Sequence, residues 1–398
     1  MLVSMIFNDR YPNSGQEWKE QRRFGMRTLK DFGFGKTSME DDINQEVQKL
    51  VSLLREKHLG TPVHLNGIMN LSIVNALWVL MVGEKLALDD QKLLSIVKAL
   101  DSFIRHRTIP NPVWALFGPW AVERFDPLYK NALDMFNSIK SMVKPYIIEH
   151  KKATDESDED RDFVDAYIKA INKSSDSSSS FHGARGEESL VSSLLDLFLA
   201  GTETTTSSLM WGILFLLHNP EVQDKLHSEL ESVLGDKETV DYEERSNLPY
   251  TCAVINEIHR CASIVRTAIP HSMTEDVVID GHSFPKGAIV LPNLIKIHHD
   301  KRLWSNPNKF DPERFYDREK GACLSSENLM PFSVGKRYCL GQSLAEKELF
   351  MFFVGLVKAF KFEVSEKDGI PDCGYHAGSH VGIIRIAPLY KVILRSWN

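Results

Sequence analysis

A single cysteine lies on a short loop that contains glycine and runs directly into an apolar helical pattern. The loop covers residues 331–341 and reads PFSVGKRYCLG, with Gly335 and Gly341 on either side of Cys339. Glycine reaches backbone angles that are closed to other residues, so such a loop can turn sharply or lie close against a flat ligand. In residues 343–360, apolar residues recur at spacings of three and four, which predicts an amphipathic helix. The sequence therefore predicts a thiol held at the N-terminus of a helix.

This position predicts a sulfur that binds a metal or acts as a nucleophile. The partial positive charge of a helix N-terminus, together with Lys336 and Arg337, should favour the thiolate of Cys339 and lower the pKa of its thiol. An ordinary buried cysteine is the alternative. Arg337 could also pair with the carboxylate of a ligand.

The residues around the cysteine resemble the haem-binding loop of the cytochrome P450 family, FxxGxRxCxG. Phe332, Gly335, Arg337, Cys339 and Gly341 occupy its defined positions. The resemblance implies that Cys339 is the thiolate ligand of haem iron and that the other four residues form the cofactor-binding loop around it.

A second motif of this family is an ExxR pair. Glu257 and Arg260 match it, and a spacing of three places them on one helix face, where they can form an ion pair. An ion pair on the surface is the alternative. The resemblance implies that Arg314, in the segment KFDPERF, joins them in a buried Glu–Arg–Arg cluster behind the haem loop.

The long apolar run 194–217 predicts a helix through the centre of the molecule, but polar residues interrupt it at 202–206. Buried hydroxyls and carboxylates cost stability unless they are hydrogen-bonded. The segment AGTETT resembles the oxygen-activation motif of the family. That resemblance implies that its two small residues leave room over the iron and that Glu203 and Thr204 deliver protons to bound dioxygen. Threonines that bond only to carbonyls of their own helix are the alternative.

Further cofactor contacts are expected near the start of the chain and after residue 270. Trp18 and Arg22 lie one helical turn apart, so the indole N–H and the guanidinium can reach the same carboxylate. The resemblance implies that this carboxylate is a haem propionate and that His271 contacts a propionate too, with an exposed loop histidine as the alternative. The wording of several segments resembles family 2, the animal microsomal branch.

We expect a mainly α fold with a smaller β region, and the resemblance implies the cytochrome P450 fold. One domain should cover residues 1–398, with a helical part at 1–263, a β-rich part at 264–296, the haem loop and its helix at 331–360, and strands at 361–398. Apolar periodicity predicts earlier helices at 38–57, 65–81, 91–105, 127–151 and 163–172.

Microsomal members of the family have a block about the size of a small domain before the tryptophan motif, with a membrane anchor and the first strands. Trp18 lies close to the beginning of this sequence, so we expect an N-terminally truncated form that lacks both. The sequence contains no run of about twenty apolar residues, which is the length needed to span a bilayer. The segment 111–120, which includes Trp114 and Trp120, has a composition suited to a membrane surface, with core packing as the alternative.

The resemblance implies a monooxygenase with haem b as its cofactor. It would insert one atom of O2 into a small apolar substrate, such as a fatty acid, a steroid or a foreign compound, by hydroxylation or epoxidation. NADPH would act indirectly, through NADPH–cytochrome reductase, on the cytosolic face of the endoplasmic reticulum membrane. A truncated, non-catalytic product is the main alternative. An isomerase that uses haem and a thiolate would not need Glu203 and Thr204, and a cysteine hydrolase would need a histidine base beside Cys339.

Composition excludes other classes. The net charge of -7 argues against nucleic acid as a partner. Five cysteines without close pairs do not form a disulfide scaffold. Cys373, His376 and His380 have spacings that a zinc site could use, but no fourth ligand is evident nearby, so zinc is not expected.

Overall fold

The computed structural model describes residues 15–32, 37–86, 94, 97, 119–153, 160–365, 367–378 and 384–397. The helices of this part are α2 (Gly15–Asp31), α3 (Thr37–His58), α4 (Asn66–Val82), α7 (Pro119–Phe125), α8 (Pro127–Ala153), α9 (Phe163–Lys173), α10 (Gly183–His218), α11 (Pro220–Leu234), α12 (Pro249–Ala262), α13 (Leu294–His298) and α14 (Gln342–Ala359). Short 3-10 turns are η1 (Tyr242–Asn247), η2 (Pro312–Phe315) and η3 (Gly335–Arg337). The expected mainly helical architecture is confirmed.

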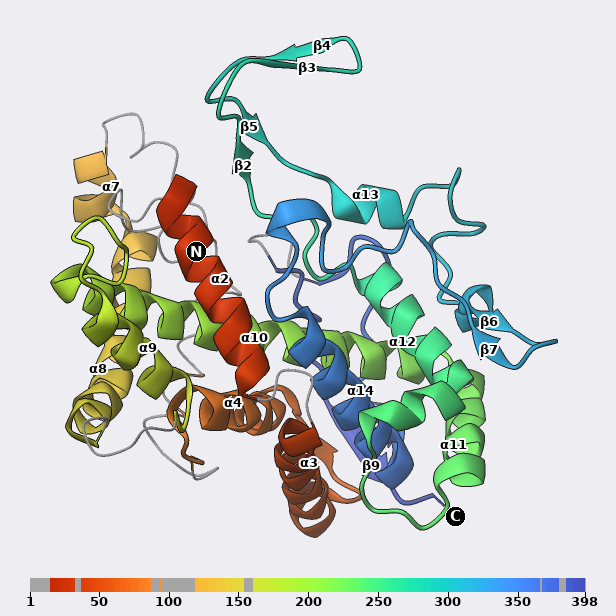
Figure 1. Cartoon of the computed structure of the whole chain (residues 1–398). Helices are drawn as coiled ribbons and strands as arrows, with labels where there is room; N and C mark the ends of the chain where they lie inside the picture. Colours follow the sequence, from red (N-terminus) through yellow and green to blue (C-terminus); the bar gives the residue numbers. More distant parts are fainter. Residues whose placement is uncertain are drawn as a thin grey trace.

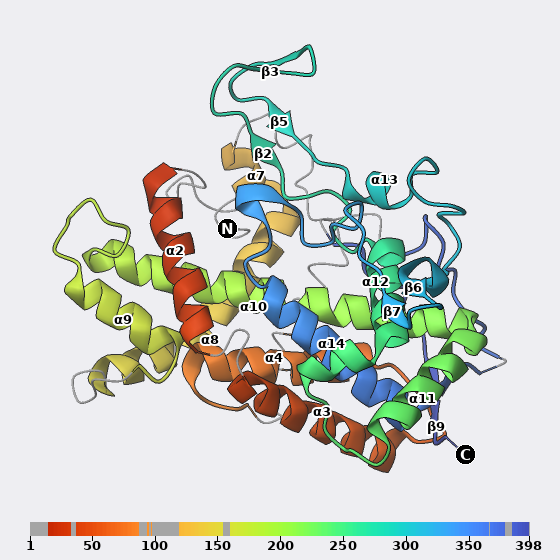
Figure 2. The ribbon, with the colours of Figure 1, turned by 45° about the vertical axis from the view of Figure 1, so that its right-hand side comes forward.

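Helix α10 is the central element. From Leu209 to Leu217 every residue of it is buried, so this stretch is enclosed by protein on all sides. It packs against α4, α8, α9, α12 and α14, and Figures 1 and 2 show it crossing the molecule behind α2 and α14. Close packing explains the glycine at position 201 of this helix, because a Cβ there would lie 2.6 Å from Cδ2 of Leu77 on α4. The small residue at 201 therefore serves the contact between these two helices, and the expectation that it leaves room over a ligand stays a prediction.

Helix α14 carries the segment that follows the cysteine loop. It packs on α3, α10 and α11, with Phe352, Phe353 and Val354 fully buried or nearly so. Lys347 of α14 forms a buried ion pair with Glu40 of α3. This helix is therefore fixed on several sides, and the start of α14 is a rigid support for the loop before it.

The β structure consists of small antiparallel sheets. The strands are β1 (Pro62–Val63), β2 (His271–Ser272), β3 (Val277–Ile279), β4 (His282–Phe284), β5 (Ile289–Val290), β6 (Tyr316–Asp317), β7 (Ala322–Cys323), β8 (Lys361–Glu363) and β9 (Val392–Arg395). One sheet has the order β1-β9-β8, and the pairs β2-β5, β3-β4 and β6-β7 form the others. Figure 1 shows the β3-β4 hairpin projecting from the helical body.

Four of the five earlier helices predicted from periodicity occur in the structure, within a few residues of the expected ends. The fifth, at 91–105, falls almost entirely outside the described residues. Strand β1 lies in the part expected to be helical. It was not predicted, because a strand of two residues is too short to show an alternating pattern. Within the described part, no helix has the length and apolar character needed to cross a membrane.

Candidate functional site

The loop before α14 folds back on itself and holds Cys339 at its far side. The backbone N–H of Cys339 donates to the carbonyl of Phe332 at 2.9 Å, and that of Tyr338 donates to the carbonyl of Gly335 at 3.2 Å. Gly335 has a φ of 77°, in the left-handed region where glycine is favoured. Gly341 occupies the N-cap position of α14. The cysteine therefore lies directly before the helix, as the sequence predicts.

The prediction of a lowered thiol pKa is wrong for this structure. Burial raises the pKa of Cys339, and this effect outweighs the hydrogen bond from the Gly341 amide and the charge of Arg22. The residue as a whole keeps an exposed surface. The thiol form is favoured at neutral pH, and a metal ion that bonds to this sulfur would have to displace the proton.

Helix α2 holds the cysteine loop from the side. Arg22 donates from Nη2 to the carbonyl of Tyr338 at 2.9 Å, and its guanidinium lies 4.9 Å from the centre of the Tyr338 ring. The guanidinium of Arg337 lies 3.6 Å from the centre of the Trp18 ring. Figures 1 and 2 show α2 beside the loop that leads into α14. The structure thus brings Trp18, Arg22 and Arg337 together around the residues next to Cys339.

The charges of this cluster suit an anionic ligand. Burial, and then the charge of Arg22, lowers the pKa of Arg337, because two like charges share one partly dehydrated place. The two guanidiniums and the indole can together provide donors for carboxylates. His271 lies on β2, and its Nδ1 is buried without a hydrogen-bond partner in the described structure. A thiol beside donors for carboxylates is a donor set that fits a haem with its two propionates.

A small cavity of about 30 Å³ lies between the cysteine loop and the central helix α10. This volume holds about one water molecule. Its walls come from α10, α12 and the turn after it, the cysteine loop and α14; they are Thr204, Thr205, Ser208, His259, Ile264, Pro331, Phe332, Ala345 and Leu349. Hydroxyl groups of α10 and the apolar face of the loop therefore border the same space.

The acid and the alcohol of the AGTETT segment are placed differently. Thr204 lines the cavity, and its hydroxyl donates to the carbonyl of Ala200 at 2.7 Å. Glu203 is fully buried away from these walls, where it accepts hydrogen bonds from Asn70 of α4 at 3.4 Å and from Ser207 at 3.2 Å. The proton-delivery role of Glu203 and Thr204 stays a prediction.

A second buried acid lies against the cavity wall and was missed in the sequence. Glu348 of α14 is 1% exposed and accepts a hydrogen bond from Thr205 at 3.2 Å, while its other oxygen has no partner in the described structure. Burial raises the pKa of Glu348 to about 8, so the carboxyl group is mostly protonated at neutral pH. A signal existed: Glu348 shares a helix face with Leu344 and Phe352, both of which are buried.

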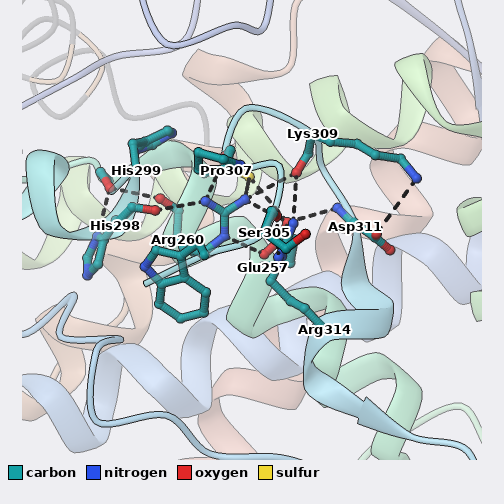
Figure 3. Close-up of polar contacts among 12 residues, drawn as sticks. Glu257, Arg260, His298, His299, Ser305, Pro307, Lys309, Asp311 and Arg314 are labelled. Atoms are coloured by element: carbon teal, nitrogen blue, oxygen red, sulfur yellow. Dashed lines mark hydrogen bonds and ion pairs between the residues drawn. The ribbon is translucent and has the colours of Figure 1, made fainter. Parts of the chain in front are cut away.

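Glu257, Arg260 and Arg314 come together in one cluster (Figure 3). Arg260 makes two hydrogen bonds to the Glu257 carboxylate, at 2.7 and 2.8 Å, and Arg314 donates to the same carboxylate at 3.1 Å. Glu257 and Arg260 are fully buried, which excludes the alternative of a surface pair. The amide of Asp311 also donates to Glu257, at 2.8 Å. The cluster thereby ties α12 to the loop that leads into η2.

Two further groups of residues fall partly or wholly outside the described structure. Of the possible zinc ligands, His380 lies outside it, as does Trp114 of the possible membrane segment. Trp120, at the start of α7, is 62% exposed. In the described ranges, the side chains that a metal ion could bridge are His150, Asp162 and Asp165. His150 is bonded to Asp162 at 2.6 Å, and Arg161 pairs with Asp165, so these groups already satisfy one another.

Comparison with known proteins places these features in one family. The family model for cytochrome P450 matches residues 8–394. The chain is 37% identical over 352 residues to cytochrome P450 2J1 of Oryctolagus cuniculus, and the aligned region covers 88% of this chain and 68% of that protein. It is similar to two human proteins as well. Cytochrome P450 2J2 is 36% identical over 351 residues, with 88% and 68% of the two chains covered, and cytochrome P450 2U1 is 33% identical over 376 residues, with 93% and 68% covered.

Proposed function

Because this chain belongs to the cytochrome P450 family of haem monooxygenases, we propose that it inserts one atom of O2 into a small apolar substrate. The substrate class is a fatty acid, a steroid or a foreign compound, and the reaction is hydroxylation or epoxidation. Electrons come from NADPH through a flavoprotein reductase. The observation that carries this proposal is the arrangement of Cys339 directly before α14, on a loop held by Arg22 of α2.

The residues of the chain have distinct parts in this proposal. Cys339 provides the sulfur ligand of the iron, and Trp18, Arg22 and Arg337 hold the propionates, with His271 as a further contact. Phe332, Gly335 and Gly341 give the loop its shape. When bound, the haem supplies the centre at which dioxygen is reduced and activated. The protein contributes the ligand, the orientation and the control of protons and water.

Proton control belongs to the hydroxyl face of α10. The Thr204 hydroxyl, at the cavity wall, would hold a water molecule in the space of about 30 Å³ and orient it. Glu203 stays the proposed source of protons for this hydroxyl. On α14, Glu348 holds a proton, and the Thr205 hydroxyl contacts its carboxyl group at 3.2 Å. Glu203 thus precedes Thr204 on α10, and Glu348 of α14 contacts Thr205.

We place the protein at the cytosolic face of the endoplasmic reticulum membrane. This proposal follows the microsomal family 2 relatives. Two exposed aromatic side chains of α7 support a contact with the membrane surface: Trp120 is 62% exposed and Phe125 is 48% exposed, and their rings lie 6.0 Å apart. Aromatic rings of this kind are enriched at the membrane interface.

The test is an isotope experiment. The chain loaded with haem is incubated with NADPH–cytochrome reductase, NADPH and a panel of fatty acids and steroids under 18O2, and the products are analysed by mass spectrometry. We expect products that carry one 18O atom, formed only when NADPH and reductase are both present. A chain that binds haem through its thiolate but yields no labelled product from any member of the panel would favour the non-catalytic alternative.

A further inference from the structure

A buried histidine is hydrogen-bonded to the residue directly before the cysteine loop. His298 is the last residue of α13 and is 1% exposed. Its Nε2 accepts a hydrogen bond from the backbone N–H of Met330 at 3.0 Å. Its Nδ1 lies 2.8 Å from the hydroxyl of Ser263, which follows α12. The imidazole therefore connects the end of α12 to the residue directly before the cysteine loop.

The chemistry of the partners fixes the state of this histidine. A backbone N–H can only donate, so Nε2 must be unprotonated, and the neutral ring must carry its proton on Nδ1. Nδ1–H then donates to the Ser263 hydroxyl, which in turn donates to the carbonyl of Arg260 at 2.8 Å. Burial, with the charges of His299, Arg260 and His259, lowers the pKa of His298 to about 3. The ring is therefore neutral and fully hydrogen-bonded at neutral pH.

The same residue is bonded to the Glu–Arg–Arg cluster through its backbone. Arg260 donates from Nη1 to the carbonyl of His298 at 2.8 Å, and Figure 3 shows His298 beside Arg260. A buried guanidinium that makes two hydrogen bonds to a carboxylate is a strong contact that makes its surroundings rigid. His298 thus has its main chain fixed by the cluster and its side chain directed at the loop.

The Met330 peptide sets the geometry of the loop that follows it. Its carbonyl accepts the N–H of Ser333 at 3.1 Å, and the carbonyl of Phe332 accepts the N–H of Cys339 at 2.9 Å. A shift of Met330 would therefore move Phe332, and with it the hydrogen bond that positions Cys339. No other contact in the described structure satisfies the Met330 N–H.

We propose that His298 is a positioning residue for Cys339: its imidazole transfers the fixed geometry of the Glu–Arg–Arg cluster to the cysteine loop and so holds the sulfur where it would bind haem iron. This inference rests on the proposed function, because only a haem ligand needs its sulfur held at a defined place. It concerns a residue outside the motifs of the sequence.

Two amide substitutions separate the two hydrogen bonds of the ring. In His298→Gln the side-chain oxygen can reach the place of Nε2 and accept the Met330 N–H. In His298→Asn the shorter amide can replace only Nδ1, so it keeps Ser263 and loses Met330. His299→Asn is the matched control, since the neighbouring His299 contacts the carbonyl of Ile295 at 3.1 Å and not the loop. Far-UV circular dichroism checks that each variant is folded.

The first readout needs no haem. Hydrogen exchange, followed by mass spectrometry of peptides that contain Met330, should be at least roughly tenfold faster in His298→Asn than in the wild type, because about 1.4 kcal/mol of hydrogen bonding is lost. His298→Gln and His299→Asn should exchange like the wild type. Equal exchange in the Asn and Gln variants would overturn the assigned hydrogen bond.

The second readout is the difference spectrum of the reduced carbon monoxide complex. We expect at least about half of the band near 450 nm to move to near 420 nm in His298→Asn, while His298→Gln and His299→Asn keep the wild-type band. An unchanged band in His298→Asn, despite faster exchange, would show that the loop does not need His298 for ligation and would sink the inference. A wild type without any such band would instead contradict the proposed function, and the exchange readout would still decide whether His298 fixes the loop.

Discussion

At the scale of single residues, the threonine hydroxyls of α10 have two kinds of partner. Thr202, Thr204 and Thr206 donate to carbonyls of their own helix, at 2.6, 2.7 and 3.0 Å. Thr205 instead bonds to Glu348 of α14. Most of the threonines that interrupt the apolar run are thus hydrogen-bonded within their own helix. Thr205 instead bonds to a buried acid of another helix, next to the cavity wall.

The acid Glu348 gives a prediction on pH dependence. Its folded pKa of about 8 lies above the ordinary value of 4.5, so its contribution to stability is complete below about pH 4.5 and is lost as the pH rises through 8. The free energy of unfolding of the wild type should therefore fall, relative to Glu348→Gln, between about pH 4.5 and pH 8. Urea unfolding of both proteins at several pH values measures this difference.

Glu346→Gln is the control for this prediction, because Glu346 lies on the same helix and is only partly buried. Its difference from the wild type should not follow the same course. Parallel curves for the wild type and Glu348→Gln over the whole range would mean that Glu348 is ionised in the folded protein.

At the scale of elements, helix α12 and helix α2 hold the cysteine loop from two directions. Helix α12 does so through the Glu–Arg–Arg cluster and His298, and α2 through Arg22 and Trp18. The contacts of α12 are buried, whereas those of α2 are partly exposed. Loss of the first should therefore affect folding, and loss of the second should affect the ligand.

For the α12 contact, we predict that Glu257→Gln destabilises the fold by about 3–5 kcal/mol, because it leaves the buried charge of Arg260 without its partner. Asp224→Asn is the control. It breaks the ion pair between Asp224 and Lys361, whose side chains are 56% and 35% exposed respectively. The loss should cost less than about 1 kcal/mol of stability. Urea unfolding measures both values. Similar small losses for the two variants would contradict a structural role of the cluster.

For the α2 contact, we predict that Arg22→Gln weakens haem binding by roughly 10- to 100-fold, which corresponds to the loss of a charged hydrogen bond of about 1.5–3 kcal/mol. The unfolding free energy without haem should change little. Arg27→Gln, on the same helix with a side chain that is 85% exposed, should bind haem like the wild type. Haem titration followed by absorbance gives the affinities, and equal values for the two variants would refute the role of Arg22.

At the scale of the whole molecule, much of the fold follows from the sequence. Apolar periodicity predicts the long helices, and the family motifs predict that Glu257, Arg260 and Arg314 share one cluster. The raised pKa of Cys339, the position of Glu348 and the contact of His298 with Met330 could not be predicted, because each depends on which segments tertiary packing brings beside them. Strand β1 was missed because two residues carry no periodic pattern.

The central claim is that the Cys339 thiolate binds haem iron, and the reduced carbon monoxide difference spectrum tests it most directly. The matched variants are Cys339→Ser and Cys373→Ser, since Cys373 is a free, partly buried thiol outside the cysteine loop. The account predicts a band near 450 nm for the wild type and for Cys373→Ser, and none there for Cys339→Ser. A wild type that shows only a band near 420 nm, or a Cys339→Ser variant that keeps the band near 450 nm, would contradict it.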